Sequence, residues 1–105
     1  MRLLRRYEIL LPLKYNEGTP VEREKFQATW KELVHRFGGV TVETQVLKGF
    51  WLHEAVEYED ELLRVVVDAP DTPEVGAFFR EWKETLKERF QQIDLWITSH
   101  AIEVV

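Results

Sequence analysis

The chain contains no cysteine, and that absence excludes several kinds of chemistry. Disulfide bonds, thiolate nucleophiles and metal sites built on cysteine ligands are all ruled out. No apolar run approaches the ~20 residues that a membrane-spanning helix needs. The segment Met1 to Arg6 is basic, but the apolar stretch of a signal peptide does not follow it. We therefore expect a cytoplasmic protein without a membrane partner.

Basic residues are also in the minority. The chain has 14 Lys and Arg against 19 Asp and Glu, for a net charge of -5. Because nucleic-acid phosphates are bound by basic surfaces, we expect no nucleic-acid partner. No phosphate-binding loop, dinucleotide fingerprint or nucleophile elbow occurs. The sequence therefore predicts no cofactor, identifies no catalytic residue and leaves open whether the protein is an enzyme.

What the sequence does contain is an order of strand, helix and strand that occurs twice. Thr19-Pro20 and Thr72-Pro73 each precede an apolar helical stripe, which predicts helices at about 20–37 and 72–90. Thr19 is the expected N-cap of the first helix, with Glu22 completing a capping box, and Gly38 is its expected C-cap. Alternating apolar residues predict four strands and a possible short fifth edge strand, at 6–13, 40 to about 49, 62–68, 93–97 and 102–105.

This order predicts one domain, residues 1–105, with an α+β ferredoxin-like β-α-β-β-α-β sandwich. Each helix has a single apolar face, so we expect both helices on the same face of an antiparallel sheet. The opposite face should be mostly polar if water covers it. Alternation places an apolar set there instead: Leu10, Pro12, Leu47, Leu62, Val66 and Trp96.

Two explanations fit this apolar set. Scattered surface hydrophobes are normal on monomers. Large contiguous apolar patches are not, and a two-fold contact would reuse one surface on both copies. We favour the second explanation, which predicts a homodimer with Leu10, Leu47, Leu62, Val66 and Trp96 at its interface.

The segment from Gly49 to Glu61, expected as the connection between the second and third strands, has the most unusual composition. Its acidic residues lie beside His53, so His53 with Glu54, Glu57 or Glu59 could bind a divalent metal or act as an acid–base pair. None of the spacings matches a metal-binding signature. We therefore expect no metal, and a solvated hairpin with Trp51 folded over the edge of the core.

The same segment suggests a recognition surface. Trp51 and Tyr58 would be aromatic anchors, and carboxylates such as Glu57 and Glu59 would steer a partner electrostatically. This hypothesis predicts a basic protein partner at residues 50–61.

Arg89 is the remaining candidate binding residue. It is expected near the apolar face of the second helix, with its stem covering the core. Its predicted partners are Asp68, Asp71 or a bound anion.

Four segments of the last two thirds of the chain resemble a known family: Gly49-Phe50-Trp51, then Glu59, then Val65 to Asp71, then Leu86 to Gln92. The family consists of small bacterial proteins of unknown function with the approximate pattern G-x-W, an acidic residue, a valine-rich strand, D-x-P-D and Y-K-x-R-F-x-Q. Leu86 replaces the tyrosine of that pattern. The resemblance supports the fold and implies no activity.

Three functions compete. The favoured one is a small homodimeric interaction or binding module. The second is a cofactor-free enzyme of the dimeric α+β barrel kind, with a pocket between sheet and helices lined by Trp30, Trp51, His53 and Tyr58. The third is a metal-dependent endonuclease of the ferredoxin-like type, against which count the acidic composition and the presence of only Glu17 near the end of the first strand.

Overall fold

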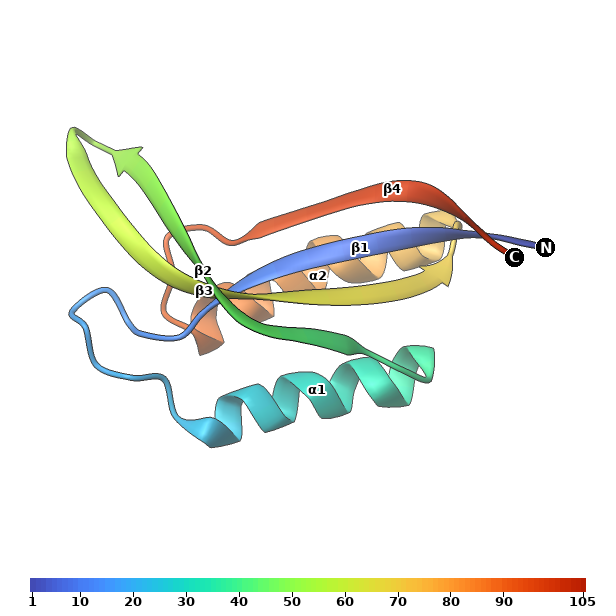
Figure 1. Cartoon of the computed structure of the whole chain (residues 1–105), viewed down its shortest axis with the longest axis horizontal. Coiled ribbons are helices and arrows are strands. Elements are labelled where there is room, and N and C mark those ends of the chain that lie inside the picture. The colour runs from blue at the N-terminus through green and yellow to red at the C-terminus, as the bar shows by residue number, and fades with distance from the viewer.

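The computed structural model describes all residues from Met1 to Val105. The chain forms a four-stranded antiparallel sheet and two helices, in the sequence order β-α-β-β-α-β (Figure 1). The elements are β1 (Arg2–Pro12), α1 (Arg23–Phe37), β2 (Thr41–His53), β3 (Val56–Pro70), α2 (Pro73–Arg89) and β4 (Trp96–Val104). The strands lie in the order β2-β3-β1-β4. This α+β arrangement is compatible with the predicted ferredoxin-like sandwich.

The core lies between the two helices and one face of the sheet. Alternate residues of β1 and β3 join helix residues in a single buried cluster that includes Ile9, Leu11, Leu33, Val65, Val67, Phe79, Leu86 and Phe90. Because alternate strand residues point to opposite faces, both helices cover the same face, as predicted. In Figure 1, α2 runs behind β1 and β4, and α1 lies below β2. The opposite face, called the open face below, has no helix over it.

The first helix begins later than predicted. Its N-cap is Glu22, which makes no side-chain capping bond, so the expected Thr19 cap and capping box are wrong. Pro20 pairs instead with Lys14 in an isolated bridge, and the Glu22 carboxylate accepts a hydrogen bond from the Tyr15 hydroxyl. These contacts keep the chain extended until Glu22. The end of the helix is as predicted, because Gly38 adopts φ 85° and its N–H donates to Val34.

The second helix follows the prediction at its start. The Thr72 hydroxyl accepts a hydrogen bond from the Val75 N–H at 3.3 Å, and Pro73 opens the helix.

The fourth strand begins later than predicted, at Trp96 and not at residue 93. No separate fifth strand exists, because Ile102 and Val104 continue β4 opposite β1. The register pairs Arg2 with Val104, so the early start of β1 gives β4 a partner along its whole length.

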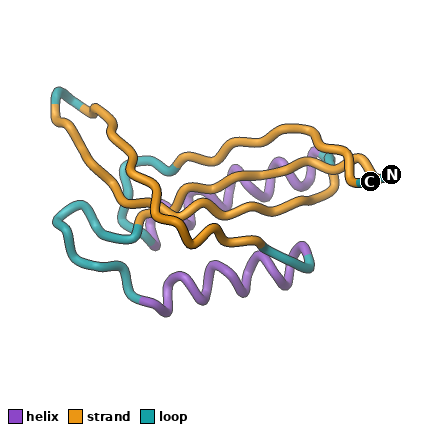
Figure 2. The backbone as a smooth tube through the Cα atoms, in the orientation of Figure 1, coloured by secondary structure: helices purple, strands orange, loops and turns teal.

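The largest departure from prediction is the connection between β2 and β3, which is an extended strand pair. β1 ends at Pro12, opposite Leu62, whereas the β2–β3 ladder continues from that level to the pair His53 and Val56. Residues 48–61, called the arm below, therefore extend beyond the sheet as a twisted hairpin (Figures 1 and 2). A two-residue turn closes it, with Glu54 at φ 48° and Ala55 at φ 64°. Positive φ at both positions is the geometry of a tight hairpin turn.

Candidate functional site

The open face carries the five residues predicted as an interface. Leu10 pairs with Trp96 across β1 and β4, and Leu47 pairs with Leu62 across β2 and β3. Val66 follows Leu62 at a distance of four positions along β3 and shares its face. Strand alternation therefore places all five on one surface, as predicted. Their role as an interface stays a prediction.

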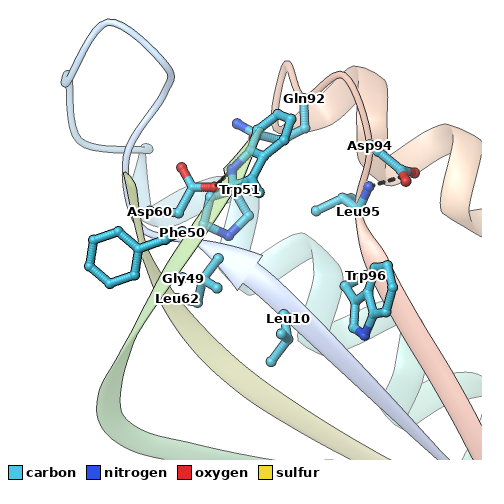
Figure 3. Close-up of a pocket in the computed structure, with 11 residues that line it drawn as sticks. Leu10, Gly49, Phe50, Trp51, Asp60, Leu62, Gln92, Asp94, Leu95 and Trp96 are labelled. Atoms are coloured by element: carbon cyan, nitrogen blue, oxygen red, sulfur yellow. Dashed lines mark hydrogen bonds between the residues drawn. The ribbon is translucent and has the colours of Figure 1, made fainter. Parts of the chain in front are cut away.

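A hollow of about 400 Å³ lies at one end of this face, between the arm and the start of β4. It is lined by Leu10, Pro12, Gly49, Phe50, Trp51, Asp60, Leu62, Gln92, Asp94, Leu95 and Trp96. In Figure 3, Trp51 lies on the arm side and Trp96 on the β4 side, with Leu10 between them. Three predicted interface residues and one predicted binding residue thus meet in a single site.

Trp51 is held in place by its neighbours on the arm. Its ring stacks on Tyr58 with the ring centroids 4.4 Å apart and the planes at 17°. Its indole N–H donates to the Asp60 carboxylate at 2.5 Å. His53 lies next along the strand face, 6.3 Å from the Trp51 ring centroid. Trp51 therefore faces the hollow on the open side of the sheet, and its expected position over the core edge is wrong.

The wall of the hollow on the β4 side, opposite Trp51, includes two buried side chains. Leu95 and Gln92 are buried, and the Gln92 amide donates to the Phe90 carbonyl. Trp96 itself is 65% exposed although it lines the hollow. A tryptophan this exposed, beside a cavity, is an available contact surface.

Asp94 is turned away from the hollow (Figure 3). Burial acts to raise the pKa of this carboxyl. The hydrogen bond from Lys83 at 3.0 Å, the bond from the Leu95 N–H and the charges of Lys83 and Lys87 outweigh burial and hold the pKa below its usual range. Asp60 is therefore the lining carboxylate that has no cationic partner within the chain.

The acidic residues of the arm are divided between its two faces. Because they lie on a strand, Glu57, Glu59 and Glu61 alternate with Tyr58 and Asp60 and point to the opposite face. Glu59 lies 3.6 Å from Lys48, and Glu61 lies 3.6 Å from Lys14. Because Glu59 and Glu61 are paired with lysines, they repel each other less than two unpaired carboxylates would. The basic protein partner at residues 50–61 stays a prediction.

His53 and Glu54 do come together, but only loosely. Their side chains approach to 3.9 Å at the exposed tip of the arm, and Glu54 is exposed. No group of three His, Asp or Glu side chains is placed to hold a metal ion. Trp30 packs against the core from α1 and does not line the hollow with Trp51, so the structure does not assemble the pocket expected between sheet and helices.

Arg89 has different partners from those predicted. Its guanidinium contacts the Glu32 carboxylate at 2.5 Å and the Thr29 hydroxyl at 2.9 Å, both on α1. Asp68 and Asp71 lie before the N-terminus of α2, and a helix of 17 residues places them about 25 Å from its C-terminal end. Arg89 therefore ties the two helices together and is not available to an anion.

Sequence reasoning missed Asp60, Phe50, Gln92 and Leu95 as residues of the hollow. Continuing the alternation of β3 back to residue 56 would have found Asp60 on the face of Leu62. Gly49 also has a role in the hollow, since a Cβ there would lie 2.9 Å from a Leu62 methyl group. The buried loop residues give no periodic signal.

No helix in this chain combines the length and the apolar character needed to cross a membrane. No family model and no curated protein matches the chain, so the resemblance to the bacterial family stays a prediction. A solved structure of a phage SAM lyase in complex with S-methyl-5′-thioadenosine is similar, with a TM-score of 0.68 and 10% sequence identity. The match covers 96% of this chain and 90% of that one. At this identity the likeness concerns the fold alone.

Proposed function

We propose that this protein is a small homo-oligomeric binding module that takes up a flat small molecule, neutral or positively charged, in the hollow. One observation carries the proposal: the fixed indole of Trp51 lies across the hollow from the exposed indole of Trp96. Ligand sites are typically concave and apolar with few polar groups, and their volumes begin at about 300 Å³. The scaffold that we infer is a ferredoxin-like sandwich, supported by the strand order and the fold likeness.

The charges around the hollow favour a neutral or positively charged ligand. Asp60 faces it, and no Lys, Arg or His lines it. Aromatic faces attract cations, most strongly when water is excluded. A flat molecule with a sulfonium or ammonium group would therefore gain contacts with both tryptophans and with Asp60.

Self-association would complete the site. Trp96 lines the hollow and also belongs to the open face, where it pairs with Leu10. A second copy on that face would cover Trp96 and close the hollow from solvent. The apolar residues of this face come from four strands: Leu10, Leu47, Leu62 and Val66 are half-buried and Trp96 is exposed. Apolar surface of this kind supports the pairing, because it marks interaction surfaces.

Calorimetric titration tests the hollow with two probes, S-adenosylmethionine, which carries a sulfonium, and S-methyl-5′-thioadenosine, which is neutral. We expect Trp96→Ala to raise the Kd about tenfold, because an aromatic contact is lost. Leu3→Ala is the matched control, since Leu3 is an exposed apolar residue at the far end of β1. Equal affinities for the two variants, or no binding of either probe at millimolar concentration, would contradict the hollow as the site.

A second candidate is an enzyme without a resident cofactor, which the fold likeness to a lyase favours. Incubation with S-adenosylmethionine, followed by chromatography, tests whether S-methyl-5′-thioadenosine is released. Release that Asp60→Asn abolishes would favour the enzyme, whereas binding without turnover would favour the module. No structural feature favours the endonuclease alternative.

A further inference from the structure

A second groove, on the helical side of the sheet, collects positive charge in a chain whose net charge is -5. It lies beside the start of α2 and the middle of β4 and has a volume of about 680 Å³. Three cations line it, Arg5 from β1 and Arg80 and Lys83 from α2, against the single carboxylate of Asp71. Arg80 and Lys83 share a face of α2 because residues three apart on a helix are neighbours.

The three cations are not equally engaged. Arg5 donates to the Ser99 hydroxyl at 2.9 Å and lies 3.7 Å from Asp71. Lys83 is paired with Asp94. Arg80 lines the groove without an ion pair or hydrogen bond inside the chain, and its guanidinium is free to bind a ligand.

A second, independent feature points into the same groove. Tyr7 is only 7% exposed, and its ring stacks on Phe79 at 3.8 Å. Its hydroxyl has no hydrogen-bond partner in the chain. Every side-chain nitrogen or oxygen that is closed to solvent does have a partner, so this hydroxyl is open to solvent. Tyr7 lines the groove, so its unpartnered and solvent-accessible hydroxyl is available to a ligand as a hydrogen-bond donor.

Gly76 keeps the space above this hydroxyl free. A Cβ at position 76 would lie 3.4 Å from an Arg80 guanidinium nitrogen and 3.9 Å from the Tyr7 hydroxyl. A Cβ there would be in ordinary van der Waals contact with both groups and would occupy the space between them. The missing side chain allows a ligand to contact Arg80 and Tyr7 together.

Further donors complete the lining. The Ser99 hydroxyl accepts from Arg5 and the Thr72 hydroxyl accepts from Val75, so the proton of each remains available to a ligand. Phe79 and Ile97 add apolar surface. Guanidinium groups and hydroxyls that converge beside an apolar wall suit an anion attached to an organic body.

We propose that this groove binds a small organic phosphate, with Arg80 as the principal ion partner and Tyr7 as a hydrogen-bond donor. A volume of about 680 Å³ exceeds what inorganic phosphate needs, so part of the groove is left for the organic body. Asp71 and the acidic character of the whole chain disfavour a nucleic-acid backbone, because phosphate chains require an extended basic surface. This inference does not rest on the ligand of the hollow.

The test is an NMR titration of amide and arginine side-chain signals with three probes: inorganic phosphate, AMP and a single-stranded DNA oligonucleotide. AMP should shift signals of Tyr7, Arg80 and Ser99 and should bind more tightly than inorganic phosphate. Arg80→Gln should raise the Kd for AMP about tenfold, because one charge-assisted contact is lost. Arg23→Gln is the charge-matched control at the start of α1 and should leave the Kd unchanged.

Two further variants sharpen the result. Tyr7→Phe keeps the ring that packs on Phe79 and should raise the Kd for AMP about threefold, since it removes one neutral hydrogen bond. Trp96→Ala should leave the AMP-induced shifts of Tyr7, Arg80 and Ser99 unchanged, which separates this site from the hollow. Equal Kd values for the Arg80 and Arg23 variants, or no shifts at millimolar AMP, would overturn the proposal. Tighter binding of the oligonucleotide than of AMP would overturn the small-molecule ligand.

Discussion

At the scale of single residues, the open face contains two ion pairs among its apolar side chains, Arg64 with Glu43 at 3.6 Å and Arg6 with Asp68. Arg6 contacts the two oxygens of Asp68 at 2.8 and 3.0 Å. The hydrogen bond from Arg6 is the main cause that holds the pKa of Asp68 below its usual range, and burial partly opposes it. A lowered pKa in the folded state means that the ionised carboxylate stabilises the fold.

This pair predicts a dependence of stability on pH. The contribution is fully present above the ordinary Asp pKa of about 4 and is lost as the pH falls through the lower pKa of the folded state. Asp68→Asn should lower the free energy of unfolding by roughly 1 kcal/mol at pH 7, since the pair is about one-third exposed and solvent screens it. Urea unfolding at pH 7 and near pH 2 measures the difference, which should disappear at the lower pH. An equal difference at both values would contradict this account.

The Arg89 side chain on α2 links this helix to α1. Glu32 accepts from both Arg89 and the indole N–H of Trp82, the latter at 2.7 Å, and Thr29 beside them is fully buried. Arg89→Gln should destabilise the protein by roughly 1–3 kcal/mol, because it leaves Glu32 and Thr29 short of a donor. Arg80→Gln on the exposed face of the same helix is the control and should change stability by less than about 0.5 kcal/mol. Thermal and urea unfolding of both variants would show whether the link has this role.

At the scale of elements, the arm depends on its turn. Glu54 and Ala55 both adopt positive φ, which costs a residue with a Cβ about 1 kcal/mol or more. Glycine adopts such angles readily. The turn geometry is therefore maintained by the ladder on either side of it and by the stacked pair Trp51 and Tyr58.

Ala55→Gly should consequently stabilise the arm, by about 0.5–1 kcal/mol. Ala28→Gly is a matched control with the opposite sign, because Ala28 is exposed within α1 and glycine lowers helix stability by about 1 kcal/mol. Hydrogen exchange of the arm amides and global unfolding report the two effects. Destabilisation by Ala55→Gly would show that the turn does not have this conformation in solution.

At the scale of the whole molecule, the proposed self-association decides whether the open face is exposed. Trp96→Glu should yield a monomer, because association would bury an unpaired charge. Leu3→Glu adds the same charge to an exposed position outside the open face and should leave the assembly intact. Sedimentation at micromolar concentration measures both variants beside the parent protein. A monomeric parent protein would remove the interface from the proposal.

Local patterns in the sequence determined much of this architecture. The Thr72 cap, the Gly38 end of α1 and the alternation that places Leu10 and Trp96 on one face were all readable, because each depends on residues close together in the chain. The acidic residues of the arm lie on an exposed hairpin, as predicted. Local patterns did not show that the pairing of β2 with β3 continues through this hairpin to its turn.

Tertiary structure alone decided the rest. Glu22 begins α1 because Tyr15 and the Lys14–Pro20 bridge hold the preceding chain extended. Arg89 meets Glu32 because α1 and α2 pack side by side on one face, a contact 57 residues apart in sequence. The hollow and the basic groove each combine side chains from separate elements. Sequence periodicity specifies which face a residue occupies, but the register and twist that bring faces together come only from the complete packing of the chain.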